Sequence, residues 1–247
     1  MTGIIIGLFI LAALASIPIA HALVLAAVGG LLIVDRVPVH LAVEQMITQT
    51  QSFPLIAIPF FMMTGALMVS GKLGQSLVNL LTMMIGRVHG GPAQVGVLSS
   101  TIFGGVSGSA VADAAALSAL LLPMMVAAGH DKARSAGLLS AASIIAPIIP
   151  PSIIMIIYAL ADDNVSVGAL FVAGVIPGIV IAVAMCVVNW YGSKQRNYKG
   201  DGEMPSWTDI VSTTWKALPA ILLPVIILGG MRAGWFTPTE ASVVAVF

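Results

Sequence analysis

Long apolar stretches separated by short polar segments run through all 247 residues of this chain. A helix that crosses a membrane needs about 20 apolar residues at about 1.5 Å of rise per residue. Most of the stretches are close to that length or to twice that length, so we expect each to form a membrane helix or a helical hairpin. They cover residues 3–34, 53–71, 88–129, 135–161 and 167–191, and a further span begins at 218–231. The pattern therefore predicts an all-α integral membrane protein with several spans.

The first stretch, residues 3–34, is too long for a single upright span. We expect it to bend at Pro18 and at the pair Gly29-Gly30, because such residues weaken or interrupt a helix. It therefore forms either one kinked span or two short ones. No basic residue precedes it, which is typical of a first span rather than of a cleaved signal peptide.

Two connections between the stretches have a pattern of their own. Residues 73–86 place apolar and polar side chains on opposite faces of a helix, which predicts an amphipathic helix at the membrane interface. Residues 200–217 are polar and contain tryptophan, so we expect a cytoplasmic connection that ends where the span at 218–231 begins. The chain stops within an apolar run, from which we expect a longer protein.

Basic residues predict which ends of the helices lie in the cytoplasm. Arg87 precedes the stretch 88–129, and Lys132 and Arg134 follow it. Both ends of this stretch should then lie on the cytoplasmic side, so the chain enters the membrane and turns back near residues 107–109. We therefore expect a re-entrant helical hairpin. The next two stretches should cross outward and return.

Two segments should break a helix inside the membrane. The sequence FGGVSGS, residues 103–109, combines glycines, which adopt positive φ, with serines, which cap helices. The sequence APIIPPS, residues 146–152, contains Pro147, Pro150 and Pro151. These prolines lack N–H donors, and each should push the preceding residue out of the helical region. Irregular backbone at membrane depth occurs only inside protein or beside a wet cavity, so both segments are candidate sites.

The chemistry of such breaks favours ions. Freed carbonyls are ligands for a hard cation such as Na⁺, and the N-terminal ends of half-helices suit the carboxylate of an anion. Asp113 follows the first break by four residues, at the start of the second half-helix. It either caps or hydrogen-bonds the hairpin, or it takes part in binding a cation. The breaks favour sodium, and the carboxylate leaves proton coupling open.

Composition removes several other classes of protein. With 59% hydrophobic residues, 8% charged residues and no net charge, the chain belongs in a lipid bilayer and offers no basic surface for nucleic acid. The single cysteine, Cys186, excludes an intrachain disulfide. No metal-binding spacing such as HExxH and no phosphate-binding loop is present, so we expect no transition-metal site and an ion gradient as the energy source.

Two rival functions come from other classes. The residues Gly105-Val106-Ser107-Gly108 fit a GxSG pattern similar to that of rhomboid intramembrane serine proteases. A serine nucleophile needs a base within reach, and His21, the histidine expected in the membrane, precedes the serine. A purely structural protein would explain small residues such as Ala114–Ala116, which let helices pack, but not two helix breaks. We therefore expect a protein that is not an enzyme.

Three segments, in this order, resemble the large membrane subunit of tripartite ATP-independent periplasmic (TRAP) transporters, of the ion-transporter superfamily. They are SGSAVADAAALSALLLPMM, APIIPPSI and FTPTEA. The resemblance spans essentially the whole chain and implies a secondary transporter of the bacterial inner membrane. In that family an inverted repeat completes the site, and the domain that carries the hairpin moves as an elevator against a scaffold.

The resemblance also implies substrates and partners. It implies Na⁺-coupled uptake of an organic anion, such as sialic acid or a dicarboxylate, that a periplasmic substrate-binding protein delivers. A separate small four-helix membrane subunit is expected as a further partner. The alternative is an anion symporter of the same superfamily that needs no binding protein.

Site residues carry over by position. The residues implied for Na⁺, which is the only metal or cofactor expected, are Ser107, Gly108, Ser109, Asp113, Ala146, Ile149, Pro150 and Pro151. Ser107 and Ser152 are implied as contacts of the anion.

The same resemblance divides the chain into five parts. Scaffold spans with the interfacial helix should occupy residues 1–87, and the re-entrant hairpin 88–131. A broken helix of the transport domain follows at 132–165, and a return span at 166–199. Residues 200–247 should contain the cytoplasmic connection and the start of a second repeat.

Overall fold

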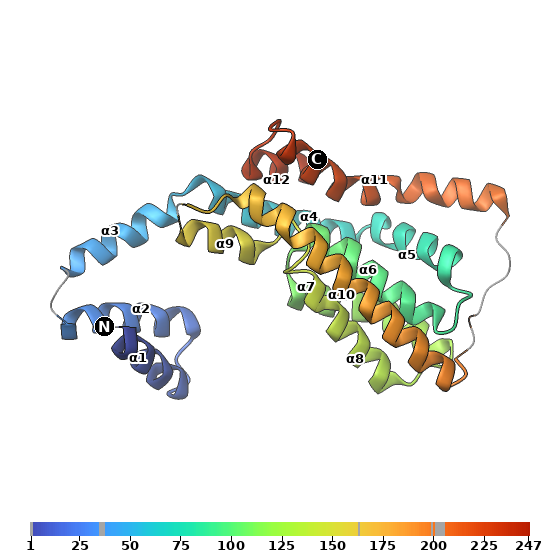
Figure 1. Cartoon of the computed structure of the whole chain (residues 1–247), viewed down its shortest axis with the longest axis horizontal. Helices are drawn as coiled ribbons and strands as arrows, with labels where there is room; N and C mark the ends of the chain where they lie inside the picture. Colours follow the sequence, from blue (N-terminus) through green and yellow to red (C-terminus); the bar gives the residue numbers. More distant parts are fainter. Residues whose placement is uncertain (1, 35–37, 163, 199, 201–205) are drawn as a thin grey trace. The chain divides into compact units, whose positions relative to one another are not determined.

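A computed structural model describes residues 2–34, 38–162, 164–198, 200 and 206–247. All regular secondary structure in these residues is helical, which confirms the all-α fold that the apolar pattern predicts. The chain divides into two compact units, Met1–Ser52 and Phe53–Phe247. Figure 1 shows the helices of both.

In the first unit, residues 3–34 form two short helices rather than one kinked span. Helix α1 (Thr2–Leu14) and helix α2 (Ile19–Val34) are separate and pack against each other, and α3 (Val39–Thr50) follows. The chain reverses where Ser16 adopts a positive φ of 58° and Pro18 offers no N–H. These two residues, not the glycine pair, therefore separate the helices.

The expected bend at Gly29-Gly30 is wrong, because α2 continues through both glycines. A Cβ atom at Gly30 would lie 2.5 Å from Cγ1 of Ile5 on α1. The absence of a side chain at this glycine lets α1 approach the backbone of α2.

The second unit contains the remaining helices. They are the 3-10 helix η1 (Phe53–Ile56), α4 (Ala57–Ser70), α5 (Lys72–Ile85), α6 (Gly91–Ser107), α7 (Ala110–Ala127), α8 (Lys132–Ala142), the 3-10 helix η2 (Ser143–Ile145), α9 (Ile153–Ala161), α10 (Val167–Gln195), α11 (Trp207–Arg232) and α12 (Pro238–Val246). Among the described residues, four segments are long and apolar enough to cross a membrane: η1 with α4, then α7, α10 and α11. The prediction of an integral membrane protein with several spans is confirmed.

Helix α5 is the amphipathic helix that the sequence predicts, although its apolar face contacts protein. Leu77, Val78 and Leu81 belong to a buried cluster with Phe103 of α6 and Ala220 of α11. Side chains of α7, such as Leu117 and Leu121, complete this cluster. Burial of apolar area stabilises the packing by roughly 25 cal/mol per Å². The cluster holds α5 against the α6–α7 hairpin, and α11 covers it.

The polar connection after α10 is shorter than the sequence predicts. Helix α11 begins at Trp207, well before residue 218, and Asp209 lies in its first turn. An acidic side chain there interacts favourably with the helix N-terminus. Residues 201–205 lie outside the described residues.

The segment that follows α10 joins the two ends of the α6–α7 hairpin. The N–H of Gly90, before α6, donates to the carbonyl oxygen of Tyr198 at 3.0 Å. The N–H of Asp131, after α7, donates to the Tyr198 hydroxyl at 3.2 Å. The ring of His130 stacks on the ring of Tyr198, with centroids 4.4 Å apart. Tyr198 therefore closes the base of the hairpin.

Helix α10 also packs closely on the chain between η2 and α9. A Cβ atom at Gly174 would collide with the carbonyl oxygen of Ile148 and lie 2.5 Å from Cε of Met155. We therefore expect Gly174→Ala to lower the free energy of unfolding by about 1–3 kcal/mol, the usual cost of overpacking. Thermal unfolding in detergent would measure this. Gly229→Ala is the control, since no atom lies within 4 Å of its added methyl group, and equal melting temperatures of the two variants would contradict the prediction.

The stacked histidine predicts a loss of stability in acid. Burial, with the charge of Arg134 nearby, lowers the pKa of His130 below its usual value of about 6.5. The folded state thus favours the neutral ring, so stability is complete above about pH 6.5 and falls as the pH drops below it. His130→Phe keeps the stack without titrating, and we expect it to flatten the dependence of the melting temperature on pH between about 7 and 5. His89→Phe, an exposed histidine before the hairpin, should behave as wild type. An unchanged pH dependence in His130→Phe would contradict the assignment.

Candidate functional site

The tip of the α6–α7 hairpin is a helix break built from three residues. Helix α6 ends at Ser107, and Gly108 adopts a positive φ of 60° while its N–H donates to the carbonyl oxygen of Gly104 at 3.1 Å. Ser109 is extended, and its hydroxyl accepts the N–H of Ala112 at 3.4 Å as the N-cap of α7. Glycine supplies the left-handed turn and serine the cap, as expected for these residue types. The break predicted at residues 107–109 is present.

Asp113 points back to this break from the first turn of α7. Its side chain is 1% exposed, and its Oδ1 accepts a hydrogen bond from the hydroxyl of Ser107 at 2.6 Å. The same hydroxyl accepts the N–H of Ser109 at 3.3 Å. The carboxylate therefore joins the two half-helices, one of the roles that the sequence left open.

The second oxygen of Asp113 has no partner in the described residues. Oδ2 is buried and makes no hydrogen bond. A buried polar atom without a partner costs about 1–3 kcal/mol, and a charged one more, so such an atom in a folded protein needs an explanation. A cation or an ordered water beside Oδ2 would provide one.

A pocket of about 600 Å³ opens beside Asp113. Its wall is formed by Met62, Gly65, Ala66, Val69 and Ser70 of α4 and by Ser107, Ser109, Ala112, Asp113, Ala116, Ala119 and Leu120 of the hairpin. A Cβ atom at Gly65 would lie 2.7 Å from Cα of Ser107, so the glycine lets α4 touch the tip. Sequence reasoning missed the α4 wall. The small pair Gly65-Ala66 and the polar Ser70 within an apolar span were the available signal.

The proline segment breaks its helix later than the sequence predicts. Ala146 keeps helical angles, φ −55° and ψ −47°, although Pro147 follows it, so the expectation for this residue is wrong. The N–H groups of Ile148 and Ile149 both donate to the carbonyl oxygen of Ile145 at 2.9 Å. These bonds continue the turns past Pro147, since a following proline disfavours helical angles without forbidding them.

The break itself closes on Ser152. This residue is extended and is the N-cap of α9, where its hydroxyl accepts the N–H of Met155 at 3.4 Å. The hydroxyl also donates to the carbonyl oxygen of Pro147 at 2.7 Å. Ser152 is fully buried and does not line the pocket beside Asp113. Both hydrogen bonds of the Ser152 hydroxyl are therefore made within the bend and the helix that follows it.

The two breaks touch each other through glycines. A Cβ atom at Gly104 would lie 2.6 Å from Cα of Ala146, and one at Gly108 would lie 2.7 Å from the carbonyl oxygen of Pro151. A Cβ atom at Gly105 would lie 3.5 Å from the carbonyl oxygen of Pro150. The structure thus brings together the hairpin tip and the proline bend, which are about 40 residues apart in the sequence.

The predicted site residues nevertheless divide into two groups. Ser107, Ser109 and Asp113 line the pocket. The bend residues Ala146, Ile149, Pro150 and Pro151 do not line it. They pack against the hairpin at its glycines. Gly108 lies between the two groups.

Within the described residues of the second unit, the serine-protease pattern has no histidine beside its serine. The Ser107 hydroxyl donates to the Asp113 carboxylate rather than to a histidine. His89 precedes α6, which has 17 residues, and His130 follows α7, which has 18, so each histidine is roughly 26 Å from the tip. In the described part of the chain, no three His, Cys, Asp or Glu side chains come together as a transition-metal site would need.

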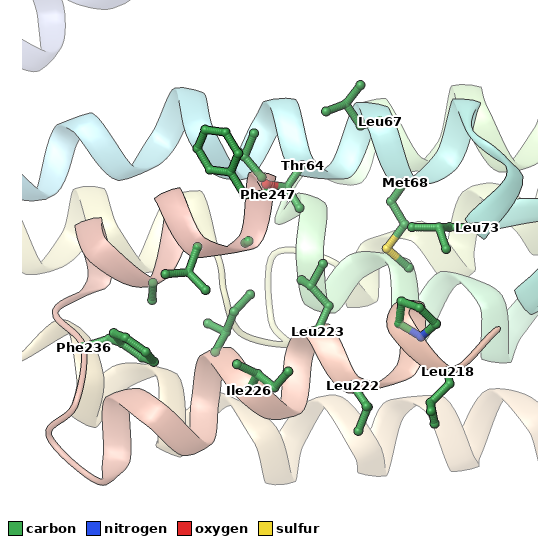
Figure 2. A pocket seen from close by; sticks show the side chains of 16 residues that line it. Thr64, Leu67, Met68, Leu73, Leu218, Leu222, Leu223, Ile226, Phe236 and Phe247 are labelled. Carbon is green, nitrogen blue, oxygen red and sulfur yellow. The ribbon is translucent and has the colours of Figure 1, made fainter. Parts of the chain in front are cut away.

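A second pocket, of about 440 Å³, lies between α4, α5, α11 and α12 (Figure 2). Apolar side chains such as Met68, Leu223 and Phe236 form most of its wall. Its polar residue Thr64 is satisfied within α4, because the hydroxyl donates to the carbonyl oxygen of Phe60 at 2.8 Å. None of the predicted site residues lines this pocket, and its wall carries no charged side chain.

Comparison with known proteins gives one consistent result. Residues 5–247 match the family model described as the DctM component of the tripartite ATP-independent periplasmic transporter. The 2,3-diketo-L-gulonate TRAP transporter large permease protein YiaN of Escherichia coli (strain K12) is 40% identical over 234 residues, 94% of this chain and 54% of the relative. The sialic acid TRAP transporter large permease protein SiaM of Vibrio cholerae (serotype O1, strain ATCC 39315 / El Tor Inaba N16961) is 35% identical over 233 residues, again 94% of this chain and 54% of the relative.

A third relative is longer. The isethionate TRAP transporter permease protein DctMQ of Oleidesulfovibrio alaskensis (strain ATCC BAA-1058 / DSM 17464 / G20) is 35% identical over 244 residues, 99% of this chain and 38% of the relative. The chain spans about half the length of the large permeases that it matches. With the family match over residues 5–247, these similarities show that the chain belongs to the DctM family of TRAP transporter components, which are multi-pass proteins of the bacterial inner membrane.

Proposed function

We propose that this chain forms one half of the transport site of a TRAP transporter, which takes up an organic anion together with Na⁺. The observation that carries the proposal is the buried Asp113 carboxylate, whose Oδ2 has no partner, beside a pocket of about 600 Å³ at a helix break. Charged groups at such a depth are costly and usually serve a transported ion. The related permeases named above are transport proteins, which favours transport over enzymatic activity.

The oxygen atoms at the hairpin tip are of the type that binds a sodium ion. Asp113 Oδ2, the hydroxyls of Ser107 and Ser109 and the backbone at Gly108 are hard oxygen ligands of the kind that Na⁺ prefers. Carbonyls of the bend from Ala146 to Pro151 would complete the ligand set, because the bend touches the tip at Gly108. Bound sodium would neutralise the carboxylate and supply the energy of its gradient.

The positive end of α7 suits an anion in the same pocket. Ser109 caps this helix and lines the pocket, so an anionic group there would face the N-terminal dipole. Of the two serines expected to contact the anion, the structure supports Ser107, which lines the pocket. We leave Ser152 out of the proposal because its hydroxyl already bonds within the bend.

The remaining partners follow from the family. Three relatives are named for 2,3-diketo-L-gulonate, sialic acid and isethionate, all of which are organic anions. We propose a periplasmic binding protein that delivers such an anion, a small four-helix membrane subunit, and a second repeat that completes the site. The hairpin would enter the membrane from the cytoplasmic side, and its domain would move as an elevator.

Uptake by the full-length protein tests the proposal as a whole. We expect proteoliposomes that contain the protein and its small subunit to accumulate an organic anion only with an inward Na⁺ gradient and the cognate binding protein. The measurement is uptake of an anion that the binding protein demonstrably binds, with and without each component. Uptake driven by a proton gradient alone would contradict sodium coupling, and uptake without the binding protein would favour the simpler symporter.

Replacement of Asp113 tests the cation site itself. Asp113→Asn keeps Oδ1 as an acceptor for Ser107 but removes the charge, so we expect the Na⁺ concentration for half-maximal uptake to rise at least about tenfold, or about 1.4 kcal/mol. The measurement is uptake against Na⁺ concentration at equal amounts of inserted protein. Asp209→Asn, the same change on an exposed helix start, is the control. Unchanged sodium dependence in Asp113→Asn would remove Asp113 from the site.

A further inference from the structure

An apolar groove of about 340 Å³ lies on the second unit, away from the transport pocket. It is formed where the end of α5, the first half of α6 and the last turns of α10 meet. Ile85, Val88, Leu98 and Val187 give it hydrocarbon walls. Its polar side chain, Gln94, donates through Nε2 to the carbonyl oxygen of Cys186 at 2.8 Å, which joins α6 to α10 beside the groove.

One end of this groove carries an aromatic ring and a positive charge. Trp190 lines the groove and is 43% exposed. Nζ of Lys194, one helical turn later, lies 5.3 Å from the centre of the Trp190 ring. This cation–π contact keeps the ammonium group beside the groove while its N–H groups stay available to an anion. The polar end of the groove is therefore cationic.

The position of this end along α10 matches a membrane surface. Tryptophan and lysine gather at the level of lipid headgroups, and basic residues mark the cytoplasmic side. Lys194 lies in the last turn of α10, and Arg196 follows the helix. The inner leaflet carries anionic lipids that attract such residues. The apolar walls of the groove and the cation at its end are therefore complementary to the acyl chain and the anionic phosphate of a phospholipid.

We propose that the groove binds an anionic phospholipid of the cytoplasmic leaflet, with an acyl chain along Val88 and Val187 and the phosphate at Lys194. Charge complementarity selects the anionic class, because a zwitterionic headgroup would place a positive group beside the same lysine. The site is separate from the pocket at Asp113, so it does not depend on the transported substrate.

Quenching of Trp190 by brominated lipids tests the proposal. The full-length protein is placed in nanodiscs with increasing fractions of dibrominated phosphatidylglycerol or phosphatidylcholine. The difference between wild type and Trp190→Phe isolates the fluorescence of this residue. We expect half-maximal quenching of Trp190 at about a fivefold lower fraction of the phosphatidylglycerol, the size expected for one lysine near an anionic surface.

Two pairs of variants make the test specific. Lys194→Gln should abolish the preference, whereas Lys216→Gln, the same change at another exposed helical lysine, should preserve it. Val187→Phe should fill the groove and weaken quenching by both lipids, whereas Val188→Phe, which does not face the groove, should not. Equal quenching by the two lipids, or a preference that survives Lys194→Gln, would overturn the proposal. Quenching by neither lipid would also overturn it, because a polypeptide would then cover the groove.

Discussion

Backbone groups released where a helix breaks inside a membrane have to find partners within the protein. The organisation of the second unit follows from this constraint. At the hairpin tip, the N–H of Gly108 donates to the carbonyl oxygen of Gly104. The hydroxyls of Ser107 and Ser109 accept hydrogen bonds from N–H groups at the start of α7. At the bend, Ser152 bonds to both sides of the break. These hydrogen bonds stabilise each turn, so that such turns can lie at membrane depth.

Close contact between the turns requires glycine. The hairpin meets the bend at Gly104 and Gly108, and it meets α4 at Gly65, with backbone atoms where side chains would normally lie. These contacts hold Asp113 between α4 and the tip, where the carboxylate bonds to Ser107 on one side and borders the pocket on the other. The geometry of the candidate site thus depends on backbone packing more than on the length of its polar side chains.

Much of this arrangement could be predicted from the sequence. Apolar stretches and charges predict the order of helices, and the FGGVSGS segment predicts the hairpin tip, because glycine and serine have local effects that need no tertiary context. One feature depends on contacts that a single sequence does not show. It is the burial of the apolar face of α5 by protein. The turn at Ser16 before Pro18 and the start of α11 at Trp207, with Asp209 in its first turn, are local features.

The candidate site, too, could be predicted only in part from the sequence. Ala146 stays helical because donors further along the chain converge on Ile145, a compensation that the rule for residues before proline omits. Helix α4 forms one wall of the pocket, but its sequence is almost entirely apolar, and only a few small and polar residues indicated this role. Local chemistry could therefore locate Asp113 and the breaks, whereas the neighbours of Asp113 required the fold.

The glycine contacts also separate the parts of the pocket that can change from those that cannot. Gly65, Gly104 and Gly108 have no room for a side chain, so substitutions there would push the turns apart. Met62 lines the same pocket and is exposed, whereas Val69 and Leu120, which also line it, pack against the buried cluster as well. An exchange at Met62 would therefore alter the shape of the cavity and leave its frame intact. A protein built in this way can acquire a new preference among small molecules one residue at a time, without refolding the hairpin on which it depends.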